Sequence, residues 1–303
     1  MSVLLVFLDG VGLGPGGVHN PFSTLDLPAF GRLGGGQRWT AAAAPVRTDR
    51  HVFVPIDATL GVEGLPQSGT GQAALFTGED AVRLHGRHFG PYPPTAVRPV
   101  VAERSVFARL AGGVGADRLA FANGYPDRFF EHVAGRGRWT VTTLAASAAG
   151  VRLRREADVA AGRALPADLT GETWARLVDP THRPTTEAEA ARRLAAIASA
   201  HAFTLSEYFL TDKAGHSRDP DRAATVLGSL DRFFGALLDA LPPDGLLVVA
   251  SDHGNLEDLG TKSHTRWPVP LVAWGPGAGA FADARSLLDV TPRVVALVAG
   301  GAG

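Results

Sequence analysis

Acidic and imidazole side chains occur in short polar segments, each next to an apolar run of the sequence. Asp212 and His216 are four residues apart in the segment TDKAGH, so a helical turn there would place both side chains on one face. Asp252 and His253 are neighbours in the segment SDHGN, where a strand that breaks into a loop can direct both side chains to one point. With two further residues of the same types, the candidate metal ligands are Asp9, Asp212, His216, Asp252, His253 and His264.

These oxygen and nitrogen donors suit two divalent cations, and phosphoryl transfer is the chemistry that such a pair of cations favours. Two metals about 3.5–4 Å apart can stabilise both the attacking and the leaving oxygen of an in-line displacement. Neutralising the charge on the phosphoryl oxygens is the main catalytic task in that reaction. The ligand set therefore predicts a two-metal site that acts on a small-molecule phosphate ester.

A candidate nucleophile, Ser68, lies in the segment LPQSGTGQAALFTG. Pro66 and Gly69 interrupt regular structure, and residues 72–76 have the pattern of a helix, so Ser68 is expected at a helix N-terminus. The backbone N–H groups and the dipole at such a terminus favour a phosphate group. A metal bound to the Ser68 hydroxyl would stabilise its alkoxide, and Thr70 is the fallback nucleophile.

Each of these features has a common structural explanation when it is taken alone. An aspartate at a strand end is often a cap, a DxxxH pair on a helix is more often a surface pair, and a serine after Pro-Gln is usually a helix cap. The catalytic interpretation is favoured because all the features occur together at predicted strand ends.

Alternating strands and helices must position these residues. A possible capping box, Thr186 with Glu189, precedes a helical stretch at 190–200, and Pro220 suits the first position of another helix. This alternation predicts an α/β fold with a largely parallel central sheet and helices on both faces, in which ligands bind beyond the carboxyl ends of the strands. The expected strands are 3–8, 119–123, 203–210, 246–250 and 269–274, with a helix at 140–150.

The composition limits the alternatives. The 303 residues are 45% apolar and carry a formal net charge of −1, which fits a packed domain and gives no overall basic field for nucleic acid. The sequence has no cysteine, which excludes thiolate metal sites and a cysteine nucleophile. No apolar run approaches about 20 residues, and residues 1–8 make a poor signal peptide, so we predict no membrane span and a cytoplasmic protein.

Five segments resemble the motifs of cofactor-independent phosphoglycerate mutases and phosphopentomutases, which belong to the alkaline phosphatase superfamily. These segments are FLDGVGLG, GLPQSGTGQ, TDKAGH, SDHGNLED and SHTRWPVPL, and the ordered set spans residues 9 to 271, from the aspartate of the first segment to the end of the last. The resemblance implies an alkaline-phosphatase-like three-layer sandwich with two divalent ions, manganese being favoured and zinc second. It further implies that Asp212, His216 and His264 hold one metal, and that Asp9, Asp252, His253 and the Ser68 oxygen hold the other.

The sequence departs from the mutase pattern at two points. Gln72 stands where the mutase motif has a histidine four residues after the nucleophile. The stretch 80–185 must supply core elements and leaves little room for a full cap, so we expect residues 1–303 to form one domain with a reduced cap. A reduced cap favours hydrolysis through a phosphoserine intermediate, because a mutase must shield its phosphoryl group from water. A phosphosugar or phosphoglycerate mutase and a non-catalytic metal-stabilised binding protein are the alternatives.

Weaker candidates complete the set. Asn123 could contact phosphate from a strand end or could be a turn residue, and Arg266 could contact phosphate or lie on the surface. Gly12, Gly14 and Gly17 match the GxGxxG dinucleotide pattern. The residues after them do not begin a helix, so we interpret the glycines as a loop beside the metal site.

Overall fold

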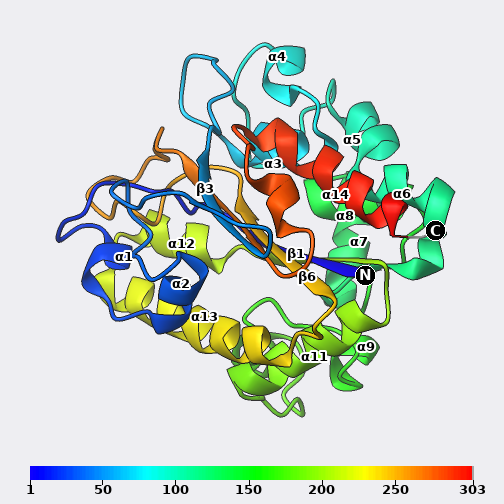
Figure 1. Ribbon diagram of the computed structural model, residues 1–303. Helices are drawn as coiled ribbons and strands as arrows, with labels where there is room; N and C mark the ends of the chain where they lie inside the picture. The colour runs from blue at the N-terminus through cyan, green and yellow to red at the C-terminus, as the bar shows by residue number, and fades with distance from the viewer. Residues whose placement is uncertain (302–303) are drawn as a thin grey trace.

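The computed structural model describes residues 1–301 and shows one mixed β-sheet with helices on both faces (Figure 1). Within these residues the sheet has seven strands in the order β2-β3-β7-β6-β1-β5-β4. The predicted α/β sandwich is confirmed. The strands are β1 (Ser2–Leu8), β2 (Val46–Arg47), β3 (His51–Ile56), β4 (Leu119–Phe121), β5 (Phe203–Tyr208), β6 (Gly245–Ser251) and β7 (Val269–Trp274).

The helices that cover the sheet come from all parts of the chain. The expected capping box at Thr186 and Glu189 is formed, and Pro220 is the first residue of a helix capped by the Asp219 side chain. The α-helices are α1 (Pro21–Thr24), α2 (Pro28–Leu33), α3 (Ser68–Thr77), α4 (Ala81–His85), α5 (Arg98–Arg104), α6 (Val106–Val114), α7 (Asp127–Arg136), α8 (Val141–Ala148), α9 (Glu156–Ala160), α10 (Glu172–Leu177), α11 (Glu187–Ser199), α12 (Leu210–Ser217), α13 (Pro220–Ala240) and α14 (Val290–Gly300).

Strand β1 lies within the parallel part of the sheet, and its carboxyl end marks the edge where the candidate site lies. Its apolar run is buried on both faces, which is typical of a parallel strand between two helix layers. It pairs in parallel with β5 and β6, and Leu8 is in register with both Tyr208 and Ser251. The next residues, Asp9 and Asp252, therefore leave the sheet side by side at its carboxyl edge.

The other half of the sheet is antiparallel and was only partly foreseen. Strand β7 runs antiparallel to β6, so its amino end lies at the edge where β6 ends. This direction brings the segment before β7, which contains His264, to the same edge as Asp252. Strand β3 (His51–Ile56) pairs antiparallel with β7. It was not predicted, because Pro55 cannot donate a backbone hydrogen bond and so argues against a strand in that run.

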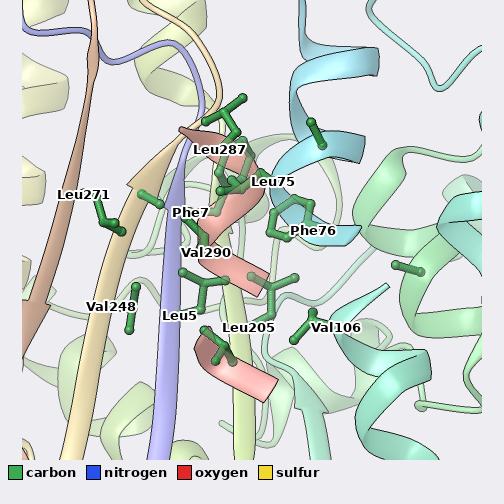
Figure 2. Close-up of a cluster of buried hydrophobic side chains, with 14 of the residues drawn as sticks. Leu5, Phe7, Leu75, Phe76, Val106, Leu205, Val248, Leu271, Leu287 and Val290 are labelled. Atoms are coloured by element: carbon green, nitrogen blue, oxygen red, sulfur yellow. The ribbon is translucent and has the colours of Figure 1, made fainter. Parts of the chain in front are cut away.

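Side chains that alternate along β1 fill two separate cores. Leu5 and Phe7 point to the layer of α3, α6, α8 and α14, where they pack with Phe76 and Val290 (Figure 2). Leu4, Val6 and Leu8 belong to the opposite core, which α2, α11 and α13 cover. Figure 1 shows the two helix layers on either side of the sheet. Burying these apolar faces contributes about 25 cal/mol per Å² to folding.

The stretch 80–185 supplies parts of the main layers as well as a small accessory unit. Strand β4 extends the sheet beside β5, and α6 and α8 pack against it as core helices. By contrast, Val159, Ala164 and Trp174 form a small cluster of their own under α9 and α10. A single domain with a reduced cap therefore stays a prediction that this arrangement favours. Among the helices of residues 1–301, none has both the length and the apolar character needed to cross a membrane.

Candidate metal centre

The carboxyl edge of the sheet gathers Asp9, Asp252 and His253 into one buried group. The ligand atoms of these three side chains all lie within 4.8 Å of one another. Nε2 of His253 lies 3.3 Å from Asp9 Oδ1 and 3.5 Å from Asp252 Oδ2. This group matches the second predicted ligand set.

A second group lies next to the first and is more exposed. Asp212 and His216 are one turn apart in α12, with His216 Nε2 3.3 Å from Asp212 Oδ2. His264 Nε2 lies 3.2 Å from His216 Nε2 and 3.6 Å from Asp212 Oδ1. The His264 ring stacks on His253 with 3.8 Å between ring centroids, so the two groups are in contact. The structure thus brings all six predicted side-chain ligands together.

The histidine rings are oriented by backbone carbonyl groups. Nδ1 of His216 lies 3.0 Å from the Lys262 carbonyl oxygen, and Nδ1 of His264 lies 2.8 Å from that of Pro66. A carbonyl oxygen can only accept, so Nδ1 carries the proton and donates it. Nε2 of each ring then presents a lone pair to the carboxylates, which is the tautomer that a metal ligand requires.

Ser68 is the first residue of α3, as predicted, and faces the buried group. Its Oγ lies 3.0 Å from His253 Nε2, and the side chain is buried. Gly71, in the same first turn, allows this close approach, because a Cβ there would lie 2.9 Å from the Asp252 carbonyl oxygen. The helix N-terminus, the hydroxyl group and the carboxylates therefore meet at one point.

The donor set fits a divalent cation. Within the described residues, Asp9 Oδ1 and Asp252 Oδ2 accept no hydrogen bond although both atoms are buried. Burial and the neighbouring Asp9 charge raise the pKa of Asp252 well above its usual value, and burial likewise raises that of Asp9. A bound cation would satisfy these lone pairs and stabilise the charged carboxylates.

The pKa values of His253 and His264 are shifted by the same group of charges. Burial disfavours a charged His253, yet the carboxylates of Asp252 and Asp9 raise its pKa to about 10. Burial and the adjacent positive His253 lower the pKa of His264 to about 4. In the metal-free protein, a protonated His253 thus supplies positive charge to the neighbouring carboxylates of Asp9 and Asp252.

A protein-family model described as the Metalloenzyme superfamily matches residues 171–299. This part of the chain is therefore similar to the Metalloenzyme superfamily. The matched region carries both candidate ligands of α12, the candidate pair after β6 and the candidate histidine before β7. The predicted relationship to metalloenzymes of the alkaline phosphatase type is thereby confirmed.

Curated relatives match short segments of the chain. A phosphopentomutase of Deinococcus radiodurans is 44% identical over 84 residues, which cover 27% of this chain and 22% of that protein. A 2,3-bisphosphoglycerate-independent phosphoglycerate mutase of Halobacterium salinarum is 36% identical over 97 residues, or 29% of this chain and 19% of that protein. The matched segments thus span only about a fifth of these relatives' own length.

Solved structures match the whole chain and show the fold. An alkaline phosphatase from the Antarctic bacterium TAB5 gives a TM-score of 0.55 at 14% identity, with 99% of this chain and 97% of that chain covered. A phosphoglycerate mutase of Leishmania mexicana gives a TM-score of 0.51 at 14% identity, with 98% and 95% covered. The chain therefore has the alkaline-phosphatase-like fold.

Several residues support the candidate metal ligands without having been assigned from the sequence. Asn255 donates from Nδ2 to Asp212 Oδ1 at 2.6 Å and fixes the orientation of that carboxylate. Gln72 donates to Asp9 Oδ2 at 3.3 Å, so the residue that replaces the mutase histidine contacts a predicted ligand. Asn255 could have been found from its place in the SDHGN motif, and Gln72 from its spacing of four residues from Ser68.

Glu257 joins three loops around the candidate metal centre. Its buried carboxylate accepts from the Gly12 and Asn255 backbone N–H groups, each at 2.8 Å, and from the Thr265 hydroxyl. A Cβ on Gly12 would overlap this carboxylate. Gly12 and Gly14 of the GxGxxG match therefore pack against Glu257, which agrees with the loop that we expected there.

Glu257→Ala is expected to lower the free energy of unfolding by about 2–6 kcal/mol, because it leaves two buried backbone N–H groups without an acceptor. Glu257→Gln is expected to cost less than about 1.5 kcal/mol, since its amide oxygen can accept both bonds and the Thr265 hydroxyl can accept from its NH₂ group. Urea unfolding of the metal-free proteins measures both values. Equal effects of the two substitutions would contradict this role.

The two weaker candidates have definite structural partners. The Asn123 amide donates to the Glu207 carbonyl oxygen and accepts from the Glu207 N–H, each at 2.8 Å, and so continues the pairing of β4 with β5. Arg266 donates to the Gly64 carbonyl oxygen and holds the loop that leads to Ser68. Contact of either residue with phosphate stays a prediction.

Proposed function

We propose that this protein is a two-metal phosphoryl-transfer enzyme in which Ser68 is the nucleophile and a phosphate ester is hydrolysed. The observation that carries the proposal is the position of Ser68 Oγ, 3.0 Å from His253 Nε2, beside two buried carboxylate oxygens, Asp9 Oδ1 and Asp252 Oδ2, that accept no hydrogen bond. A serine at a helix N-terminus is suited to phosphate as well, because backbone N–H groups favour an anion there.

Two divalent ions would be held by the two ligand groups, and they would supply positive charge at the phosphoryl oxygens and lower the pKa of the Ser68 hydroxyl. Asp212, His216 and His264 would hold one ion, and Asp9, Asp252, His253 and Ser68 the other. Mixed oxygen and nitrogen donors accept manganese or zinc, and we favour manganese.

The residues of the chain perform the remaining tasks. The Ser68 oxygen forms a bond to phosphorus as the bond to the ester alcohol breaks, and the alcohol leaves with a proton. Water then attacks the phosphoserine, which releases inorganic phosphate and restores the Ser68 hydroxyl. Gln72 and Asn255 keep Asp9 and Asp212 in place during both steps.

Hydrolysis is favoured over mutase activity by the small size of the accessory unit around α9 and α10. A mutase must exclude water while its substrate reorients, and closure of a cap normally provides that exclusion. Mutase activity is the second candidate, because the curated relatives that match this chain are named mutases. A binding protein without activity is the third, and a cytoplasmic location stays a prediction from the sequence.

A panel of phosphate monoesters and diesters, incubated with the manganese- or zinc-loaded protein, tests the proposal. We expect metal-dependent release of inorganic phosphate from at least one ester. Interconversion of phosphosugar or phosphoglycerate isomers without phosphate release would instead establish a mutase. Two bound metals with neither reaction would support the binding protein.

A further inference from the structure

A pocket of about 210 Å³ opens against α12, the helix that carries two candidate metal ligands, and the mechanism does not yet use it. Its walls include the side chains of Tyr125, Trp174 and Phe209, and Leu177 at its rim is 54% exposed. Pockets for drug-sized ligands are typically about 300–1,000 Å³. We call this space the ring pocket, because its size and aromatic walls suit one ring-sized group.

Helix α12 connects the ring pocket to the metal centre. Successive residues of a helix are about 100° apart, so Asp212, His216, Lys213 and Leu210 follow one another around α12 at about 0°, 40°, 100° and 160°. The first two are candidate metal ligands, whereas Lys213 and Leu210 line the ring pocket. A group in the pocket therefore lies next to the face of α12 that would hold the metal.

The base of the ring pocket is a built polar site. Glu207 lines the pocket and is only 9% exposed, although no step of the proposed reaction uses it. Its carboxylate accepts from the Tyr125 hydroxyl and from Thr142 Oγ1, the latter at 2.6 Å, so its position is fixed. Each carboxylate oxygen can accept a second hydrogen bond, which leaves Glu207 able to bind a donor on a ligand.

The charged residues that line the ring pocket balance one another, with Arg128 and Lys213 opposed by Asp168 and Glu207. Arg128 and Lys213 line it together with Asp168, and the Lys213 ammonium lies over the Phe209 ring at 4.6 Å. A strongly anionic second group would require an excess of cations, which these residues do not provide. The apolar walls and the buried acceptor instead favour an uncharged, flat group.

We propose that the ring pocket binds the alcohol portion of the phosphate ester and selects alcohols that carry a flat, largely apolar ring, with any N–H or O–H donor of the ring directed to Glu207. This inference rests on the proposed function, because the phosphate group of the same molecule occupies the metal centre. It names the substrate class that the phosphoryl-transfer chemistry leaves open.

Two non-hydrolysable probes test the inference by binding alone. Calorimetric titration of the manganese-loaded protein with benzylphosphonate and ethylphosphonate compares a ring with a short chain. We expect benzylphosphonate to bind at least about tenfold more tightly, since burial of a ring outweighs that of a methyl group. Equal dissociation constants would overturn the inference.

Variants assign the preference to the ring pocket. Ala167→Phe fills the pocket and is expected to remove the tenfold preference, and Leu177→Asp, at the exposed rim, is expected to weaken it without a risk to the core. Ala44→Phe makes the first change on an exposed loop and serves as the control. A preference that survives both pocket variants, with unchanged melting temperature and metal content, would also overturn the inference.

Turnover separates this inference from the proposed function. Benzyl phosphate and ethyl phosphate both release alkyl alcohols, so a higher kcat/KM for the benzyl ester reports recognition of the ring. Hydrolysis of both esters at equal kcat/KM, with equal phosphonate binding, would support the phosphatase activity and contradict the proposed role of the ring pocket. No turnover of any ester, with the benzylphosphonate preference intact, would contradict the phosphatase activity and support ring binding by the pocket.

Discussion

Ser68→Ala is expected to lower metal-dependent phosphate release by at least about 10³-fold, because the oxygen that attacks phosphorus is removed. The variant should still bind metal, since the two carboxylates and His253 of the same group remain. Phosphate release and metal content, measured on the same preparation, test both statements. Intact mass spectrometry adds a third readout, because a phosphorylated form is expected only with Ser68 present.

Thr70 provides the matched control for the nucleophile. Its hydroxyl accepts from the Phe89 N–H at 3.1 Å and so ties α3 to a neighbouring loop. Thr70→Val removes this hydroxyl at nearly constant shape, and we expect lower stability but phosphorylation still at Ser68. Full activity of Ser68→Ala, with loss of activity in Thr70→Val, would reassign the nucleophile to Thr70.

Asp252→Asn is expected to change stability in opposite directions with and without metal. In the metal-free protein it removes a buried carboxyl group whose charged form is disfavoured by burial and by repulsion from Asp9, so the melting temperature should rise. Gly10 N–H, which lies 3.3 Å from Asp252 Oδ1, can still donate to the amide oxygen. With manganese present, the variant loses a charged ligand and should gain far less stability than the wild type.

Binding theory sets the scale of this difference. A metal at 100 times its dissociation constant stabilises a folded protein by about 2.7 kcal/mol, which corresponds to a shift of several degrees. Differential scanning calorimetry with and without manganese measures the shift for each protein. Asp244→Asn, on an exposed turn, is the control for the chemical change itself. An equal metal-induced shift in melting temperature for Asp252→Asn and the wild type would contradict the assignment of Asp252 as a metal ligand.

The sequence predicts the parallel half of the sheet better than the antiparallel half. The run at 3–8 is apolar at every position, because β1 is covered on both faces, and such a run is visible without any structural context. Strand β3 lacks that signal, since His51 and Pro55 interrupt its apolar residues and its partner β7 lies more than 200 residues away. Strand direction was also not encoded locally, because it follows from how β7 returns beside β6.

The group of candidate metal ligands was predictable for a reason that does not extend to the residues that support it. Carboxylate and imidazole groups at strand ends are uncommon enough to be noticed as a set, and parallel strands must end at one edge. Glu257 and Glu207 act through partners that are distant in the sequence, such as Gly12 and Tyr125. Their roles depend on contacts between loops, which no local pattern specifies.

The central position of β1 has a consequence for synthesis of the protein. Both neighbours of β1 in the sheet, β5 and β6, come from residues 203–251, so almost 200 residues are added after β1 before its first partner exists. At a translation rate of about 5–20 residues per second, this interval is roughly 10–40 s. During that time an apolar strand with two unpaired edges is exposed on the nascent chain. The central position of β1 that places Asp9 in the candidate site thus also leaves the growing polypeptide in need of protection from aggregation until β5 and β6 have emerged from the ribosome.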